Sequence, residues 1–177
     1  MKKFKKASVM PLVIAIITVM LVFTDSLVAP LFATGVAFTW MAFLNWTVFF
    51  GATNKERLRA PLGYIVGYLA ANAMLWIGSN FVNIVSLQII NITFALLVGV
   101  FLVTLAVCYL DNAKQLYLNS VPAIFLGIAL TFSGAGIGLA AYDVILLMII
   151  LIYGVLGLIC SFATNYFVTL INRKLKY

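Results

Sequence analysis

The sequence predicts an all-α fold: a polytopic membrane helix bundle, with six transmembrane helices in two inverted three-helix repeats. Of the 177 residues, 66% are hydrophobic and only 8% are charged, and the mean hydropathy is +1.20. Soluble domains carry about 25% charged residues, so this chain cannot cover its surface with polar groups and must use lipid as its solvent. The apolar runs are long and do not alternate, which excludes a β-barrel. We expect a single integral membrane domain over residues 1–177.

Six apolar segments can be marked out, at about residues 10–32, 36–51, 61–78, 86–110, 118–133 and 143–171. A helix needs about 20 residues to cross a bilayer, so the second and fifth segments are short. The sixth is long enough to tilt, or to leave the membrane at its end. Pro61 is expected to open the third segment, and Ser120 to cap the fifth just ahead of Pro122. The basic N-terminus is also typical of a signal peptide, but we expect an uncleaved first helix, because the apolar run continues past Asp25.

The basic residues predict the orientation. If the N-terminus lies inside and all six segments cross, the inside regions are the tails 1–9 and 172–177 and the loops 52–60 and 111–117. These regions hold all the basic residues: Lys2, Lys3, Lys5, Lys6, Lys55, Arg57, Arg59, Lys114, Arg173, Lys174 and Lys176. Basic residues concentrate on the cytoplasmic side of membrane proteins, so both termini are predicted to be cytoplasmic. The net charge of +7 then reflects contact with anionic headgroups and not nucleic-acid binding.

The two short segments share a phrase. Residues 43–50 and 125–132 both run Phe-Leu, five further residues and Phe, and Gly-Ala follows shortly after each. The copies begin 82 positions apart, at Phe43 and Phe125. Because each half holds three crossings, the second repeat is inverted, with repeat one at about 10–80 and repeat two at about 86–165. Coincidence is the alternative, since Phe, Leu and Gly are common in this chain.

Paired short helices with glycine breaks are where small transporters and channels place their working site. The substrate path predicted from this pairing consists of Phe43, Asn45, Phe50, Phe125, Thr131, Phe132 and Asp25. The four phenylalanines would form an apolar collar, and the amide of Asn45 and the hydroxyl of Thr131 would replace the hydrogen bonds of a solute. Plain helix packing is the alternative for the collar, and a hydrogen bond that joins two helices is the alternative for Asn45.

Polar residues inside apolar spans are costly and often functional. Asp25 is the only acid within a segment, where it acts either as a counter-charge or proton site in an outer vestibule or as a helix-end residue at headgroup level. Ser161, Asn165 and Thr169 recur every four residues and so form one stripe on the inner half of the sixth helix. This inner polar stripe either lines an inner vestibule or faces the cytoplasmic interface.

Catalysis is hard to build from these residues. The chain has no His, four acids and two isolated cysteines, Cys108 and Cys160. It therefore offers no acid–base pair, no activated nucleophile and no set of metal ligands. The sequence predicts no enzyme, no cofactor and no metal site.

A family resemblance covers about residues 10–165. The stretches from Thr39 to Phe50, from Ala113 to Leu116 and from Ser120 through Pro122 to Gly134 resemble the YcdZ-like small bacterial inner-membrane proteins, which carry domain of unknown function 1097. Asn45 departs from the small residue that is usual there, which weakens a family-wide role for its amide. The resemblance implies a multi-pass protein of the bacterial cytoplasmic (inner) membrane and brings no substrate.

The leading functional hypothesis is a channel or facilitator for a small, mostly uncharged solute, because intramembrane charge is nearly absent. A proton-coupled secondary transporter that uses Asp25 is the second, and a non-transporting membrane scaffold that binds a partner protein or senses lipid is the third. The expected partners are the lipid bilayer and a small neutral solute, without nucleic acid, and a homo-oligomer is compatible with the sequence.

Overall fold

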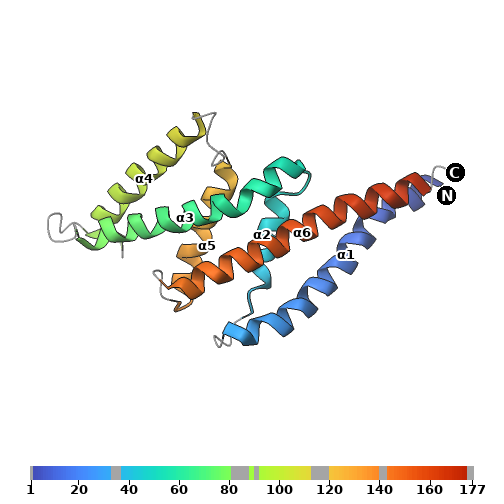
Figure 1. The fold of residues 1–177 in the computed structure, drawn as a ribbon, viewed down its shortest axis with the longest axis horizontal. Helices are drawn as coiled ribbons and strands as arrows, with labels where there is room; N and C mark the ends of the chain where they lie inside the picture. The colour runs from blue at the N-terminus through green and yellow to red at the C-terminus, as the bar shows by residue number, and fades with distance from the viewer. Residues whose placement is uncertain are drawn as a thin grey trace. The chain divides into compact units, whose positions relative to one another are not determined.

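The computed structural model describes residues 2–32, 37–80, 88–89, 92–112, 120–139 and 143–174. In these ranges the chain is almost entirely helical (Figure 1). The helices are α1 (Lys2–Val28), the 3-10 turn η1 (Ala29–Phe32), α2 (Thr39–Val48), α3 (Asn54–Asn80), α4 (Phe94–Asn112), α5 (Val121–Gly136) and α6 (Val144–Lys174). Each of the six predicted apolar segments thus carries one α-helix, and the all-α prediction is confirmed.

The second and fifth helices are short, as predicted. The helix α2 has 10 residues and α5 has 16, against 31 in α6. The start of α5 also follows the sequence signals, since Ser120 is its N-cap residue and Pro122 lies in its first turn. Pro is well placed there because the first turn of a helix needs no backbone N–H from it.

Two predicted helix starts are wrong. The third helix begins at Asn54, so Pro61 lies inside α3 and does not open it. The sequence carries a capping box that the prediction missed: Glu56 Oε2 accepts the backbone N–H of Thr53 (2.6 Å) and its hydroxyl (2.8 Å), while Thr53 Oγ1 accepts the N–H of Glu56 (3.3 Å). This reciprocal bonding satisfies backbone donors at a helix N-terminus and starts the helix seven residues earlier than predicted.

In the described part of the fourth segment, the helix α4 begins at Phe94. Ahead of it, the two-residue strands β1 (Gln88–Ile89) and β2 (Ile92–Thr93) pair antiparallel, with Gln88 opposite Thr93 and Ile89 opposite Ile92. Isoleucine and threonine are β-branched and favour strand over helix, so the apolar run from residue 86 was wrongly predicted to be helical throughout. The segment from Ala113 to Leu116 lies outside the described residues, as does the basic residue Lys114.

The chain forms two compact units. Unit 1 comprises residues 1–57 and 152–177, and so contains α1, α2 and most of α6. Unit 2 comprises residues 58–151, and so contains most of α3, all of α4 and α5, and the first turns of α6. Each unit therefore takes two of its helices from one half of the sequence and one from the other half.

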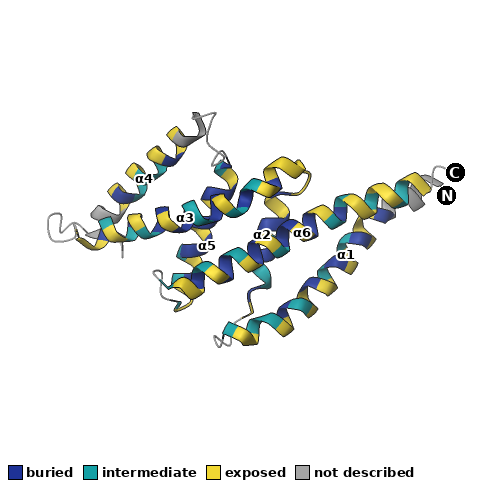
Figure 2. Ribbon diagram, in the orientation of Figure 1, coloured by how far each residue is buried: buried dark blue, intermediate teal, exposed yellow. Residues whose placement is uncertain are grey.

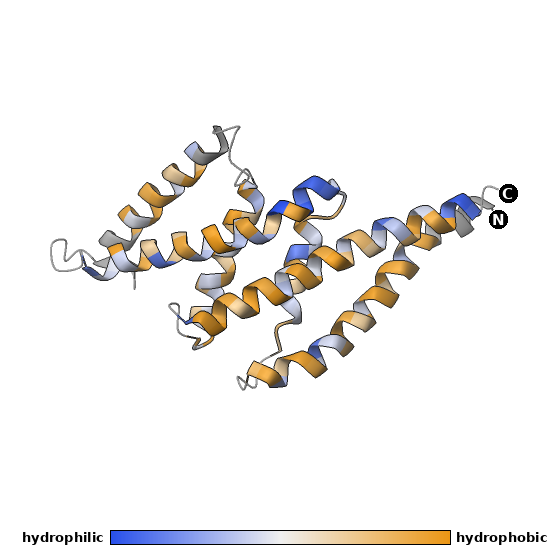
Figure 3. Ribbon diagram, in the orientation of Figure 1, coloured by the Kyte–Doolittle hydropathy of each residue, from blue (hydrophilic) through white to orange (hydrophobic). Residues whose placement is uncertain are grey.

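The described helices carry the apolar surface that a bilayer requires. Three are long and apolar enough to cross a membrane, at Val9–Phe32, Asn54–Asn80 and Val144–Lys174, and Leu97–Tyr109 and Val121–Gly136 are shorter apolar helices. Figure 2 shows exposed residues along each of the long helices, and Figure 3 shows that most of their length is hydrophobic. Val19 and Phe23 of α1, for example, are 69% and 65% exposed. Such faces are stable against lipid and not against water, which indicates a membrane protein.

Candidate functional site

In unit 1, the short helix α2 rests on a glycine of α6. A Cβ atom added to Gly157 would lie 2.5 Å from Asn45 Cβ and 3.0 Å from the backbone nitrogen of Trp46, and closer still to the carbonyl oxygen of Ala42. No side chain fits in this space. Gly157 therefore allows the backbones of α2 and α6 to touch, as small residues do between membrane helices.

In unit 2, α5 rests on a glycine of α3 in the same manner. A Cβ atom added to Gly67 would lie 2.8 Å from both Gly127 Cα and the nitrogen of Ile128, and closer still to the carbonyl oxygen of Ile124. Ile124, Gly127 and Ile128 follow the three α2 residues at Gly157 by the same 82 positions that separate the two Phe-Leu phrases. The shared phrase of the sequence thus marks the same packing contact in each unit, made in both by a carbonyl oxygen and a backbone nitrogen at corresponding positions.

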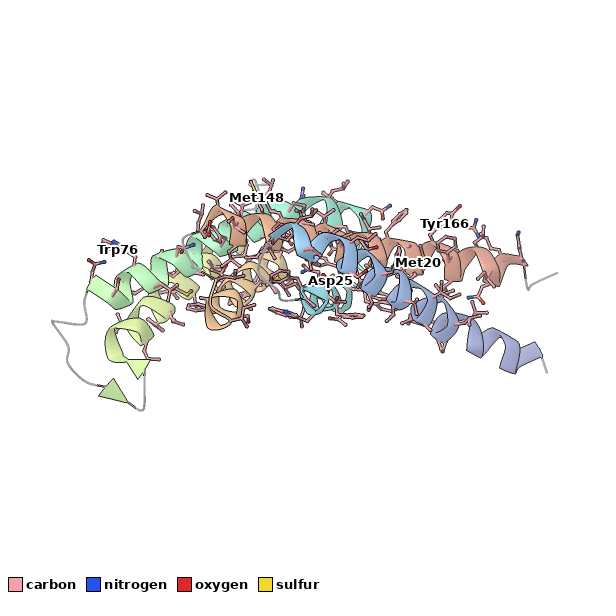
Figure 4. The ribbon with its side chains drawn as sticks, turned by 90° about the horizontal axis from the view of Figure 1, so that it is seen from below. Met20, Asp25, Trp76, Met148 and Tyr166 are labelled. Carbon is pink, nitrogen blue, oxygen red and sulfur yellow. The ribbon has the colours of Figure 1, made fainter. Side chains whose placement is uncertain are left out.

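Asp25 joins three helices of unit 1. Its side chain is only 4% exposed, and it is labelled in Figure 4. At the start of α2, the backbone N–H groups of Phe38 and Thr39 donate to its two carboxylate oxygens at 3.3 and 3.2 Å. The hydroxyl of Thr39 donates to Oδ2, and the hydroxyl of Tyr153 on α6 donates to Oδ1. The carboxylate also lies at the positive end of the α2 helix dipole, which favours a negative charge.

The polar atoms of α2 have fewer partners. Asn45 is fully buried, and its Nδ2 donates to the carbonyl of Met41 in its own helix at 2.8 Å. Asn45 Oδ1 and Trp46 Nε1 are buried and have no hydrogen-bond partner. The ring of Phe43 stacks on Trp46, with centroids 6.0 Å apart and planes at 11°. An acceptor and a donor without partners therefore lie on consecutive residues of α2, inside the apolar part of unit 1.

The predicted inner polar stripe divides into two parts. Ser161 is fully buried, and its hydroxyl donates to the carbonyl of Phe49 at 2.5 Å, near the C-terminal end of α2. Asn165 and Thr169 instead line a cleft of about 250 Å³. Ser161 therefore joins α6 to the end of α2, whereas Asn165 and Thr169 lie further along α6 and line the cleft.

This cleft lies within unit 1, between the last turns of α6 and the first turn of α3. Its lining residues are Asn54, Arg57, Phe162, Asn165, Tyr166, Thr169, Leu170 and Arg173. The side chain of Arg57 is only 9% exposed, and its Nη1 donates to Asn54 Oδ1 at 3.1 Å. Its Nε and Nη2 are buried without a partner. Figure 3 shows that hydrophilic residues gather at these ends of α3 and α6.

The predicted path residues of unit 2 have ordinary packing roles in the structure. Thr131 is fully buried and donates to the carbonyl of Gly127 in its own helix at 2.7 Å. Phe132 packs against a core cluster that includes Met74 and Ile124. Phe125 is 38% exposed, and Phe50, in the turn after α2 in unit 1, is 39% exposed. The collar that would combine rings of both units stays a prediction.

The chain belongs to the DUF1097 family. The family model, described as "Protein of unknown function (DUF1097)", matches residues 12–165. Searches of curated proteins and of solved structures gave no match. Membership supplies no substrate and no activity, so the function must come from the geometry.

The sequence prediction missed three residues that the structure assigns to polar sites. Tyr153 binds Asp25, Thr39 binds the same carboxylate at the start of α2, and Arg57 forms part of the cleft. One signal was available, because Arg173 follows Thr169 by four positions and Tyr153 precedes Ser161 by eight, which places both on the helix face of Ser161, Asn165 and Thr169. In the described part of the chain, no group of three His, Cys, Asp or Glu residues could hold a metal ion.

Proposed function

We propose that this DUF1097 protein is a channel or facilitator for a small, mostly uncharged polar solute in the bacterial cytoplasmic membrane. It crosses the membrane six times, and its two halves are three-helix repeats of opposite orientation. The observation that carries this proposal is the matched packing of the short helices, α2 on Gly157 and α5 on Gly67. Paired short helices in inverted repeats are where known transporters form their solute sites.

The chemistry of α2 supports a neutral solute. Asn45 Oδ1 can accept and Trp46 Nε1 can donate one hydrogen bond, and neither has a partner in the protein. A buried polar group without a partner costs about 1–3 kcal/mol, and a small solute with one donor and one acceptor would remove this cost for both. A hydrated ion would have to exchange its water for these two uncharged groups, which is far more costly.

The four phenylalanines of the shared phrase supply the barrier in this proposal. In the proposed path, Phe43 and Phe50 of unit 1 and Phe125 and Phe132 of unit 2 would each present an apolar ring to the solute, and such a collar resists ions more than neutral solutes. Replacing Phe50 or Phe132 with Ala widens the collar and raises flux. Phe101→Ala on α4 is the matched control, because that ring is 66% exposed and lies outside the proposed path.

Stopped-flow swelling of proteoliposomes with a panel of small solutes tests the function. Wild-type protein should speed the entry of at least one uncharged solute over empty liposomes. Phe50→Ala and Phe132→Ala should speed it further, and Phe101→Ala should match the wild type. If no solute enters faster than in empty liposomes for the wild type and both path variants, the protein is a scaffold and not a facilitator.

Asp25 has a supporting role in this mechanism. Both of its oxygens already accept hydrogen bonds from α2 and α6, so it holds the short helix in place and carries no proton across the membrane. Uptake by the wild type should therefore not require a proton gradient. Gradient-driven accumulation that Asp25→Asn abolishes would instead identify a proton-coupled transporter.

The orientation in this proposal has both termini in the cytoplasm, and it rests on the eleven basic residues. Single cysteines at positions 3, 56, 82, 114, 137 and 176 test it in a background without Cys108 and Cys160. An impermeant thiol reagent added outside intact cells should label only positions 82 and 137. Labelling of position 56 or 114 from outside would contradict six crossings.

A further inference from the structure

The cleft of unit 1 contains a buried guanidinium, one edge of which has no hydrogen-bond acceptor. Arg57 is 9% exposed, and only its Nη1 has a partner, the neutral side-chain oxygen of Asn54. Its Nε and Nη2 form one edge of the guanidinium, and both are buried without a hydrogen-bond acceptor. Buried donors of a charged group are strongly unfavourable when they have no acceptor. An anion bound at this edge would remove that cost.

The described carboxylates of the chain are engaged elsewhere. Asp25 accepts hydrogen bonds from α2 and Tyr153, Glu56 accepts the N–H and hydroxyl of Thr53, and Asp143 accepts the N–H of Ile145. None of these three acids lines the cleft. Glu56, on the neighbouring turn position, is an acid whose charge acts on Arg57, but it neither lines the cleft nor accepts a hydrogen bond from the buried Nε and Nη2.

We propose that the cleft is a binding site for a phosphate group. The Nε and Nη2 edge of Arg57 has the spacing that binds two oxygens of one phosphate at once. Arg173 adds a second positive charge to the lining, and Asn165 and Thr169 add neutral donors. Two cations with several donors suit a phosphate, which has more acceptor oxygens than a carboxylate.

The apolar part of the lining indicates where this phosphate comes from. Phe162, Tyr166 and Leu170 also line the cleft and are 50%, 54% and 38% exposed, and Tyr166 is labelled on α6 in Figure 4. Apolar side chains beside a phosphate site match the first carbons of an acyl chain next to a lipid headgroup. An anionic phospholipid therefore fits both parts of the lining, whereas a soluble phosphate fits only the polar part. This site is independent of the proposed solute path.

Binding of defined probes to the full-length protein in a nonionic detergent tests the site. The probes are dihexanoyl phosphatidylglycerol, inorganic phosphate and the phosphate-free dihexanoylglycerol, and the readouts are native mass spectrometry and the shift in unfolding temperature. We expect phosphatidylglycerol to bind and stabilise the wild type, since a ligand of the folded state raises stability. Arg57→Gln should weaken this binding by at least about tenfold, since it removes the charged fork. Lys55→Gln, two residues before Arg57 and absent from the lining, should bind as the wild type does.

The source of the phosphate follows from the relative affinities. Tighter binding of phosphatidylglycerol than of inorganic phosphate assigns a lipid, and equal binding assigns a soluble phosphate at the same site. Because Arg57→Gln removes a buried side chain, Arg173→Gln at the exposed end of α6 provides a second variant, which should also weaken binding of both phosphate probes. Binding of dihexanoylglycerol as tight as that of phosphatidylglycerol would overturn the phosphate site, as would phosphate-probe affinities that neither arginine variant lowers.

Discussion

The contact of α2 with α6 in unit 1 and the contact of α5 with α3 in unit 2 share one backbone geometry and differ in their side chains. In both, a glycine of a long helix meets a carbonyl oxygen and a backbone nitrogen of a short helix. In unit 1, Tyr153 and Ser161 of α6 add hydrogen bonds to Asp25 and to the carbonyl of Phe49. The α3 residues 90 positions earlier are Gly63 and Ala71, which have no side-chain donor.

This difference shows which part of the contact belongs to the fold and which part is specific to one copy. The close approach needs small residues in both units, and unit 2 uses more of them: a Cβ atom at Gly63 would lie 2.5 Å from Ala123 Cβ, and one at Gly127 would lie 2.6 Å from the carbonyl of Tyr64. Unit 1 replaces part of this packing with buried hydrogen bonds. We infer that unit 2 is stabilised mainly by van der Waals contact and unit 1 also by the Asp25 hydrogen bonds.

The largest expected effect is that of a bulky residue at either glycine. Gly67→Leu and Gly157→Leu should each abolish the folded, monodisperse protein in size-exclusion chromatography, because the added atoms would overlap backbone and not flexible side chains. The alanine variants should each cost about 1–3 kcal/mol of unfolding free energy, as overpacking does. Gly136→Ala is the control, since nothing lies within 4 Å of its added Cβ. A folded leucine variant in only one unit would show that the two contacts are not equivalent.

Removal of the carboxylate should destabilise one unit selectively. Hydrogen bonds to a charged group contribute about 1.5–3 kcal/mol each, and Asp25→Ala removes the acceptor of four donors. We expect a loss of at least about 3 kcal/mol and a smaller loss for Tyr153→Phe, which removes one donor. Hydrogen exchange should increase at the start of α2 and stay unchanged in α5. Equal increases in both helices would contradict a role confined to unit 1.

The serine of α6 should have a moderate effect. Ser161→Ala removes one neutral hydrogen bond, which is worth about 0.5–1.5 kcal/mol. The carbonyl of Phe49 keeps the N–H of Ala52 as a donor at 3.1 Å, so the cost should fall in the lower half of that range. Thr164→Val is the control, because its hydroxyl donates within α6 to Cys160. Thermal unfolding in detergent measures the stability of both variants. A loss of stability for Ser161→Ala no larger than for the control would show that this hydrogen bond does not distinguish unit 1 from unit 2.

The smallest expected effect on stability is that of Asn45. Asn45→Ala removes a hydrogen bond within α2 together with the unpaired Oδ1, so the unfolding free energy should change by less than about 1 kcal/mol. Solute flux should nevertheless fall in the proteoliposome assay, because the donor group of the solute then has no Oδ1 to bind. Unchanged flux with unchanged stability would show that Asn45 is not part of the path.

Much of the fold could be predicted from the sequence, and its errors have local causes. The number of helices and the shortness of two of them follow from the lengths of the apolar runs. A chain segment in an apolar solvent must make its backbone hydrogen bonds within itself, so each apolar run forms one helix. The start of α3 was missed because the capping box of Thr53 and Glu56 lies in a polar stretch outside the apolar run. The start of α4 was missed because hydropathy alone does not distinguish β-branched strand residues from helical ones.

The sequence by itself determined the membrane class, the apolar segments, and the repeated phrase whose spacing of 82 recurs in the two glycine contacts. These depend on composition and on neighbours along the chain. Only the tertiary structure decided that Asp25 is bound by Tyr153, 128 positions away, and that Arg57 is buried in a cleft. A buried polar group takes its role from the groups that folding brings to it, and spacing in the sequence does not encode them.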